Sequence, residues 1–273
     1  MSGRTDAPGG EDANTPASEG AAETAEEPLD PELVDRDAAA RGALYSILAR
    51  GFRHPDEELH AAAAAGDLRA EVEALADTAA LDLAVPALGT DDDFETLCAR
   101  YNDLFVIGFA AYEDRTDGSL ATDGPPVPLY ESTYRPEASW GDVNLDLARA
   151  YEYFGLGVDQ DDRDNHDALP LQLEFAAYLA RREAVGEAGA AAARLDLLDR
   201  HLSYVGAGVC ERLADESGTG FFGHLGDLLA ALVQAEQADL GKRRDDGEFE
   251  VDDAAFEVDD AAFEVEDAAL DDQ

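Results

Sequence analysis

The residues best suited to chemistry lie in one short stretch, 164–175, which reads DNHDALPLQLEF. His166 stands between Asp164 and Asp167, and a carboxylate beside an imidazole can form an acid–base pair. Asp167 could instead cap the helix that follows, and Pro170 suits a first helical turn because its missing N–H costs nothing there. A third interpretation is a contact site that a rigid helix presents to a partner.

The sequence lacks motifs that would complete a catalytic or metal site. It contains no GxSxG nucleophile elbow and no GxxxxGK[ST] phosphate loop. The five histidines show no HExxH spacing, and Cys98 and Cys210 have no CxxC partner. We therefore expect a protein that is not an enzyme and that holds neither a metal nor a cofactor.

The charge balance is extreme, because 63 Asp and Glu residues face 19 Lys and Arg residues and give a net charge of −44 at pH 7. Such a field repels nucleic acid and anionic membrane surfaces. Lys242 is the only lysine, and this composition is typical of salt-accumulating halophiles, whose cytosol screens self-repulsion. An acidic docking face for a partner is compatible with the same composition.

No segment of the sequence is suited to crossing or entering a membrane. The N-terminus lacks the basic start and apolar stretch of a signal peptide, and no apolar run is long enough to span a bilayer. We expect a cytoplasmic protein without stable membrane insertion.

Both ends of the chain are predicted to be disordered acidic tails, at 1–36 and 242–273. The N-terminal tail has almost no large apolar side chains, so burial cannot offset the entropy cost of ordering it. The C-terminal tail carries a seven-residue repeat, FEVDDAA at 249–255 and 256–262 and FEVEDAA at 263–269. Its Phe and Val residues are two positions apart and form no coiled-coil seam, although the phenylalanines could anchor a partner.

The elements that must position the 164–175 stretch are helices within residues 37–241. Apolar residues recur there every three or four positions, as in Leu44, Leu48 and Phe52. Helices are expected at 36–52, 67–81, 92–108, 142–156, from 169 onward, 194–214 and 221–240. Alternating strand patterns are nearly absent and alanine is abundant, so the sequence predicts an all-α, single-domain helical bundle.

The longest irregular connection inside this domain is 124–140, GPPVPLYESTYRPEASW. Four prolines stiffen it, and Tyr130, Tyr134 and Trp140 supply aromatic surface. A stiff aromatic loop suits peptide capture. The same rings could equally cover the open end of the bundle.

Several segments, in this order, resemble the TorD/DmsD/NarJ family of maturation chaperones for molybdopterin enzymes, over residues 37–240. The most specific are the Tyr-x-x-Leu-Phe segment in LCARYNDLFVIG, the Pro-x-Tyr-Glu-Ser-x-Tyr loop in PVPLYESTY and the Leu-Pro-Leu-x-Leu-Glu-Phe helix start in DALPLQLEFAAYLARRE. The family marker is an acidic-Pro-Asp-His-Leu turn before a Leu-Glu-Phe helix start. Here Asp167 matches the marker Asp, but Ala168 stands at the His position and His166 lies on the other side of the Asp.

The resemblance implies an all-helical cytoplasmic chaperone that binds the precursor of a molybdopterin-containing oxidoreductase catalytic subunit. Family members often bind the twin-arginine leader and hold the subunit until its cofactor is inserted. The implied peptide-binding residues are Leu104, Phe105, Pro128, Tyr130, Glu131, Ser132, Tyr134, His166, Asp167, Leu169 and Glu174.

One further expectation concerns two carboxylates in this set. Glu131 and Asp167 are expected to meet the leader guanidinium groups beside an open apolar groove. The alternative function is a non-enzymatic acidic scaffold or regulatory bundle that recruits partners through its tails.

Overall fold

A computed structural model describes residues 32–107, 110–114, 119–122, 124–158 and 165–250. The predicted disordered tails therefore lie largely outside the described residues. The described C-terminal part is helical to Asp245, beyond the boundary expected at residue 241.

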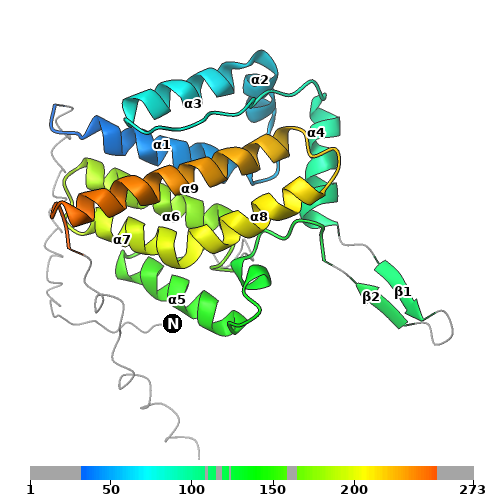
Figure 1. Ribbon diagram of the computed structural model, residues 1–273. Coiled ribbons are helices and arrows are strands. Elements are labelled where there is room, and N and C mark those ends of the chain that lie inside the picture. The colour runs from blue at the N-terminus through cyan, green and yellow to red at the C-terminus, as the bar shows by residue number, and fades with distance from the viewer. Residues whose placement is uncertain (1–31, 108–109, 115–118, 123, 159–164, 251–273) are drawn as a thin grey trace, which may run out of the picture.

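The described body is a helical bundle (Figure 1), which confirms the predicted all-α fold. The helices are α1 Arg36–Gly51, α2 Glu57–Ala65, α3 Asp67–Thr78, α4 Phe94–Tyr101, α5 Trp140–Tyr153, α6 Leu169–Ala184, α7 Ala190–Leu197, α8 Ser203–Asp215 and α9 Phe221–Asp245. Two π-helical turns, η1 Asn102–Val106 and η3 Leu198–Leu202, and a 3-10 turn, η2 Glu131–Tyr134, connect them. The predicted helix at 194–214 is α7, η3 and α8 in continuous succession, whereas α2 was not expected.

The centre of the bundle is the antiparallel pair α1 and α6. Gly42 allows this close approach, because a Cβ there would lie 3.1 Å from the Ala177 carbonyl oxygen. Leu48 of α1 and Phe52 at its C-cap are fully buried against their neighbours. In Figure 1, α2 and α3 lie at one edge of the bundle and α5 lies at the opposite edge.

A two-stranded hairpin departs from the all-helical expectation. Strands β1 Ala110–Asp114 and β2 Ser119–Thr122 pair antiparallel and project from the bundle beyond α4 (Figure 1). The sequence between the strands contains Asp-Gly at 117–118, a pair that favours two-stranded hairpins. The hairpin adds no layer to the core that the helices form.

A buried ion-pair cluster joins α1, α6, α7 and α9. Glu236 of α9 is fully buried and lies 2.7 Å from Arg41 Nη1 of α1 and 2.9 Å from Arg194 Nε of α7. Arg194, itself fully buried, is also 2.7 Å from Glu183 of α6. These contacts replace hydration for charges that could not otherwise be buried.

The run GTGFFG at 218–223 has the glycine spacing of a dinucleotide-binding loop and opens α9. It follows helix α8 rather than a strand, so the strand–loop–helix context that such a loop needs is missing. Glu216 and Asp227 line the adjoining cavity and would repel a phosphate. The run is therefore a helix connection.

No helix among the described residues is long and apolar enough to cross a membrane. The same residues contain no group of three or more His, Cys, Asp or Glu side chains placed to hold a metal ion.

Candidate functional site

Two segments that the sequence analysis singled out separately lie side by side. We call residues 128–134 the strap and residues 165–169 the opening turn. Tyr130 and Ala168 form an antiparallel bridge between them. The Leu169 amide donates to the Leu129 carbonyl at 2.8 Å, and the Glu131 amide donates to the Asp167 carbonyl at 3.1 Å. The strap is therefore held by backbone hydrogen bonds to the start of α6.

Asp167 is fully buried and fixes the strap rather than the helix. Its Oδ2 accepts a hydrogen bond from the Ser132 amide at 3.0 Å, and its own amide donates to Asn144 Oδ1 at 3.3 Å. The N-cap of α6 is Ala168, which makes no side-chain cap bond, so the predicted helix cap at Asp167 is wrong. Pro170 does stand in the first turn of α6, as expected.

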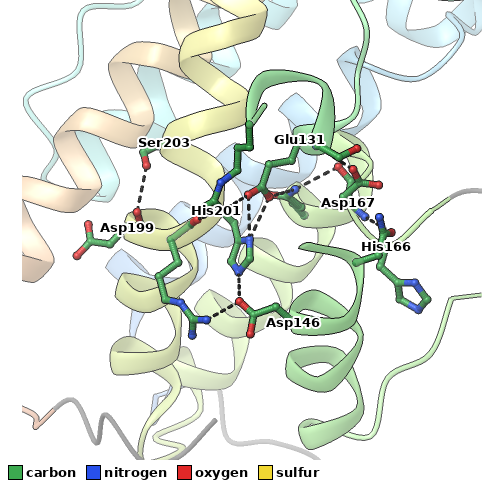
Figure 2. A network of polar contacts seen from close by, with 12 residues as sticks. Glu131, Asp146, His166, Asp167, Asp199, His201 and Ser203 are labelled. Carbon is green, nitrogen blue, oxygen red and sulfur yellow. Dashed lines mark hydrogen bonds and ion pairs between the residues drawn. The ribbon is translucent and has the colours of Figure 1, made fainter. Parts of the chain in front are cut away.

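Glu131 is the second buried carboxylate of the site (Figure 2). It accepts hydrogen bonds from Arg135 Nη1 at 2.7 Å and from Gln172 Nε2 at 2.9 Å. Nδ1 of His201 lies 3.0 Å from Glu131 Oε2. One strap carboxylate is thus tied to α6 and to the η3 turn.

His201 connects the strap to α5. Its Nε2 lies 3.1 Å from Oδ2 of Asp146, which also pairs with Arg200 (Figure 2). Burial alone would lower the pKa of His201, but the hydrogen bonds and charges of Asp146 and Glu131 outweigh it and raise the pKa. Burial would raise the pKa of Asp146, but His201 and Arg200 hold it below its usual value.

Tyr134, the last residue of the strap, packs its ring against α8. Its hydroxyl donates to the Pro128 carbonyl at 2.7 Å, and burial raises its pKa. The ring lies directly over Gly208, where an added Cβ would be 2.2 Å from Tyr134 Cδ1. Only glycine allows this contact without displacing the ring.

We expect Gly208→Ala to destabilise the protein by about 1–2 kcal/mol and to displace Tyr134, because overpacking outweighs the better helix propensity of alanine. Gly206→Ala, two residues earlier in α8, is the matched control. A Cβ at Gly206 would make only ordinary contacts, at 3.7 Å from Leu229, so that change should be neutral or stabilising. Urea unfolding of both variants measures the difference. Equal effects would contradict the proposed packing of Tyr134.

The structure divides the predicted peptide-binding residues into three groups by exposure. Buried members are Leu104, Phe105, Glu131, Asp167 and Leu169. Half-buried members are Pro128, Tyr130, Ser132, Tyr134 and His166. Glu174 is exposed. The expectation that Glu131 and Asp167 present open carboxylates is wrong for this conformation, since both side chains are enclosed by their hydrogen-bond partners.

Leu104 and Phe105 belong to the core. Phe105 packs edge-on against Phe52 and Phe222, with ring centroids 6.1 and 5.4 Å away. The Leu104 carbonyl accepts from the Val127 amide at 2.9 Å, just before the strap. Both side chains therefore pack in the core next to the segment that leads into the strap, and they do not line an open groove.

Glu174 faces a different environment from the strap. It pairs with Arg53 at 2.9 Å in a groove of about 530 Å³ between α1 and α6. Arg50 and Arg181 also line that groove. Because Arg53 already occupies the Glu174 carboxylate, Glu174 is not a free acceptor for a further guanidinium group.

The acid–base interpretation of His166 gains no support. Its ring points away from the Glu131–His201 contacts in Figure 2, and no bond to a carboxylate joins it within the described residues. Its carbonyl accepts a hydrogen bond from Tyr151 at 2.9 Å. Asp164, the other predicted partner, lies outside the described residues.

Sequence reasoning missed the residues that organise the site, which are Asp146, Gln172 and His201. His201 lies 70 positions from Glu131, so no local spacing could pair them. One signal was available, because His201 stands among Leu198, Leu202 and Val205 on the apolar face of a predicted helix. A titratable residue on such a face needs a buried partner.

Comparisons with known proteins cover the same region. A family model described as nitrate reductase delta subunit matches residues 61–207, more than half of the chain and a range that includes the strap, the opening turn and His201.

Three characterised proteins are similar in sequence. The perchlorate reductase assembly chaperone protein of Dechloromonas aromatica (strain RCB) is 27% identical over 223 residues, 77% of this chain and 93% of that protein. The selenate reductase assembly chaperone protein of Thauera selenatis is 35% identical over 55% of this chain and 72% of its own length. The chlorate reductase assembly chaperone protein of Ideonella dechloratans is 33% identical over 57% and 74%, respectively.

Proposed function

Since this chain belongs to the nitrate reductase delta subunit family, we propose that it is an assembly chaperone for the catalytic subunit of a molybdopterin-containing oxidoreductase. The three similar proteins are each named as assembly chaperones of a reductase, which supports this role. We further propose that it acts in the cytoplasm on the subunit precursor, at its twin-arginine leader or on the apo subunit, before cofactor insertion and export.

The pairing of the strap with the opening turn is the observation that carries the proposal. Buried hydrogen bonds fix both segments from the inside, while Tyr130, Ser132, Tyr134 and His166 remain half exposed. Aromatic side chains held by a rigid support lose little entropy when they bind a peptide. The accessible members of the predicted set thus form the proposed contact surface, and the buried members are its supports.

Two buried hydrogen-bond acceptors lie where the strap meets the start of α6, and they favour a ligand with many hydrogen-bond donors. Asp167 Oδ1 and Gln172 Oε1 have no hydrogen-bond partner among the described residues. Leaving a buried acceptor unpaired costs about 1–3 kcal/mol. An arginine side chain offers five donors and no acceptor, so a leader guanidinium that reached Asp167 would recover part of this cost. Binding by this route requires the strap to move.

The titratable groups support binding rather than catalysis. Carboxylates occupy both ring nitrogens of His201, so the imidazole has no free position for a substrate proton. Burial raises the pKa of the Cys210 thiol to about 11, which leaves it a poor nucleophile near neutral pH.

The test is isolation of the tagged full chain from its host with its bound partner. We expect an oxidoreductase catalytic subunit that lacks its molybdopterin cofactor and whose binding weakens when its leader is deleted. Calorimetry with that leader should show about tenfold weaker binding for Tyr130→Ala, as for a typical interface anchor. Tyr153→Ala is the control, because Tyr153 is an exposed aromatic residue of α5 outside the strap.

Other outcomes would contradict the proposal. Loss of the partner on removal of residues 251–273, with no effect of Tyr130→Ala, would favour the acidic scaffold. Recovery of a subunit that already contains its cofactor would argue against a role in assembly.

A further inference from the structure

His201 joins three parts of the fold through one ring. It belongs to the π-helical turn η3, its Nδ1 lies 3.0 Å from Glu131 of the strap, and its Nε2 lies 3.1 Å from Asp146 of α5. The ring is almost fully buried. Single π-helical turns inside α-helices often mark functional positions.

Both contacts require the imidazolium form. A neutral imidazole has one N–H and one lone pair, whereas the protonated ring donates from both nitrogens. Carboxylates of Glu131 and Asp146 can only accept. Whichever tautomer the neutral ring adopts, one carboxylate would face a lone pair, and the connection between the strap and α5 would be broken.

The charges around the ring also favour its proton. Groups that face it or its direct partners are Glu131 and Arg135 near the strap, Asp146 on α5, Asp167 in the opening turn, Asp196 on α7 and Arg200 in η3. Gln172 from α6 and Tyr151 from α5 are neutral neighbours. Four carboxylates therefore meet two guanidinium groups, and the imidazolium supplies a third positive charge.

The raised pKa of His201 fixes the direction of the pH dependence. A group whose pKa is higher in the folded state stabilises that state fully below its unfolded value, about 6.5 for histidine. This stabilisation is lost as the pH rises through the folded value. The contacts of His201 should therefore weaken toward alkaline pH.

We propose that the proton on His201 is a latch that holds the strap and α5 together, and that its loss releases the strap from the opening turn. The latch is a property of the free protein. Only its consequence, access to the half-exposed strap residues and to Asp167, rests on the proposed function.

Hydrogen exchange of the full-length chain tests the latch without a client. The reporters are the Glu131 and Ser132 amides, which donate to Asp167. Their protection factors should fall about tenfold between pH 6 and a pH above the folded pKa, as for loss of one hydrogen bond to a charged group. In His201→Gln they should be low and independent of pH. The His224→Gln variant, which changes a partly exposed histidine of α9 outside both the latch and the opening turn, should behave as wild type.

Constant protection across this pH range would overturn the latch, and so would an equal effect of His224→Gln. Proton and nitrogen NMR of the His201 ring in the wild-type chain keeps the test valid if the glutamine variant fails to fold. Protons on both ring nitrogens at pH 6, with one lost in step with amide protection, would support the latch. A neutral ring at pH 6 would exclude it.

The effect of the latch on client binding is measured separately, as the pH dependence of affinity. Affinity for the subunit isolated with the chain should rise with pH, because strap opening releases the proton. Affinity that does not change with pH would overturn the regulatory role. Absence of any client would contradict the proposed function and leave the exchange result intact.

Discussion

Replacing Glu131 by alanine is expected to lower the free energy of unfolding by about 3–5 kcal/mol, the range for breaking a buried ion pair by removing one partner. Arg135, Gln172 and His201 all donate to this fully buried carboxylate. The variant leaves two positive charges without their anion and a cavity beside them.

Urea unfolding at constant salt measures the change in stability. Glu137→Ala is the matched control, since Glu137 is an exposed carboxylate 4.0 Å from the same arginine. That change should alter stability by less than about 0.5 kcal/mol. Glu131→Gln keeps an acceptor without the charge and should fall between the two. A loss below about 1 kcal/mol for Glu131→Ala would mean that the strap carboxylate is not enclosed as described.

The second large effect is expected at Glu236, far from the strap. Alanine there should also cost about 3–5 kcal/mol, because Arg41 and Arg194 would lose a shared buried carboxylate. The Tyr45 hydroxyl, 3.3 Å from Glu236 Oε2, would lose its acceptor as well. The fully buried Arg194 would keep its ion pair with Glu183 alone among the described residues. Client contacts should be unaffected as long as the variant folds.

Two further variants distinguish the effect of this buried cluster on stability from that of a surface charge. Glu248→Ala removes an exposed partner of Arg243 and should change stability by less than about 0.5 kcal/mol. Replacing Arg41, Arg194 and Glu236 together by apolar residues of similar volume should restore most of the stability lost in Glu236→Ala. A small effect of the single change, or no recovery in the triple variant, would contradict the assignment.

The two buried clusters differ from the many surface ion pairs in their response to salt. Molar salt shortens the Debye length to about 3 Å and weakens exposed pairs such as Arg69–Glu73. Enclosed pairs are screened much less. For a chain with a net charge of −44, the contacts that fix the strap and those that join α1, α6, α7 and α9 are thus the ones that would persist at high salt.

The sequence by itself determined the helical architecture and the segments that form the site. Helical periodicity located α1, α3, α6 and α9 because burial of an apolar stripe depends on residues three and four apart. Pro170 placed the start of α6 for an equally local reason, its compatibility with a first helical turn. Residue types and loop composition identified the opening turn and the strap as separate segments.

Only the tertiary structure decided what these motifs do to each other. Asp167 was expected on the surface or as a helix cap, and it is buried beneath the strap. His201 carried no motif, yet it binds Glu131 and Asp146 from 70 and 55 positions away. The physical reason is that a helix follows from neighbours in sequence, whereas the burial of a charge depends on partners that only the folded chain brings within hydrogen-bond distance.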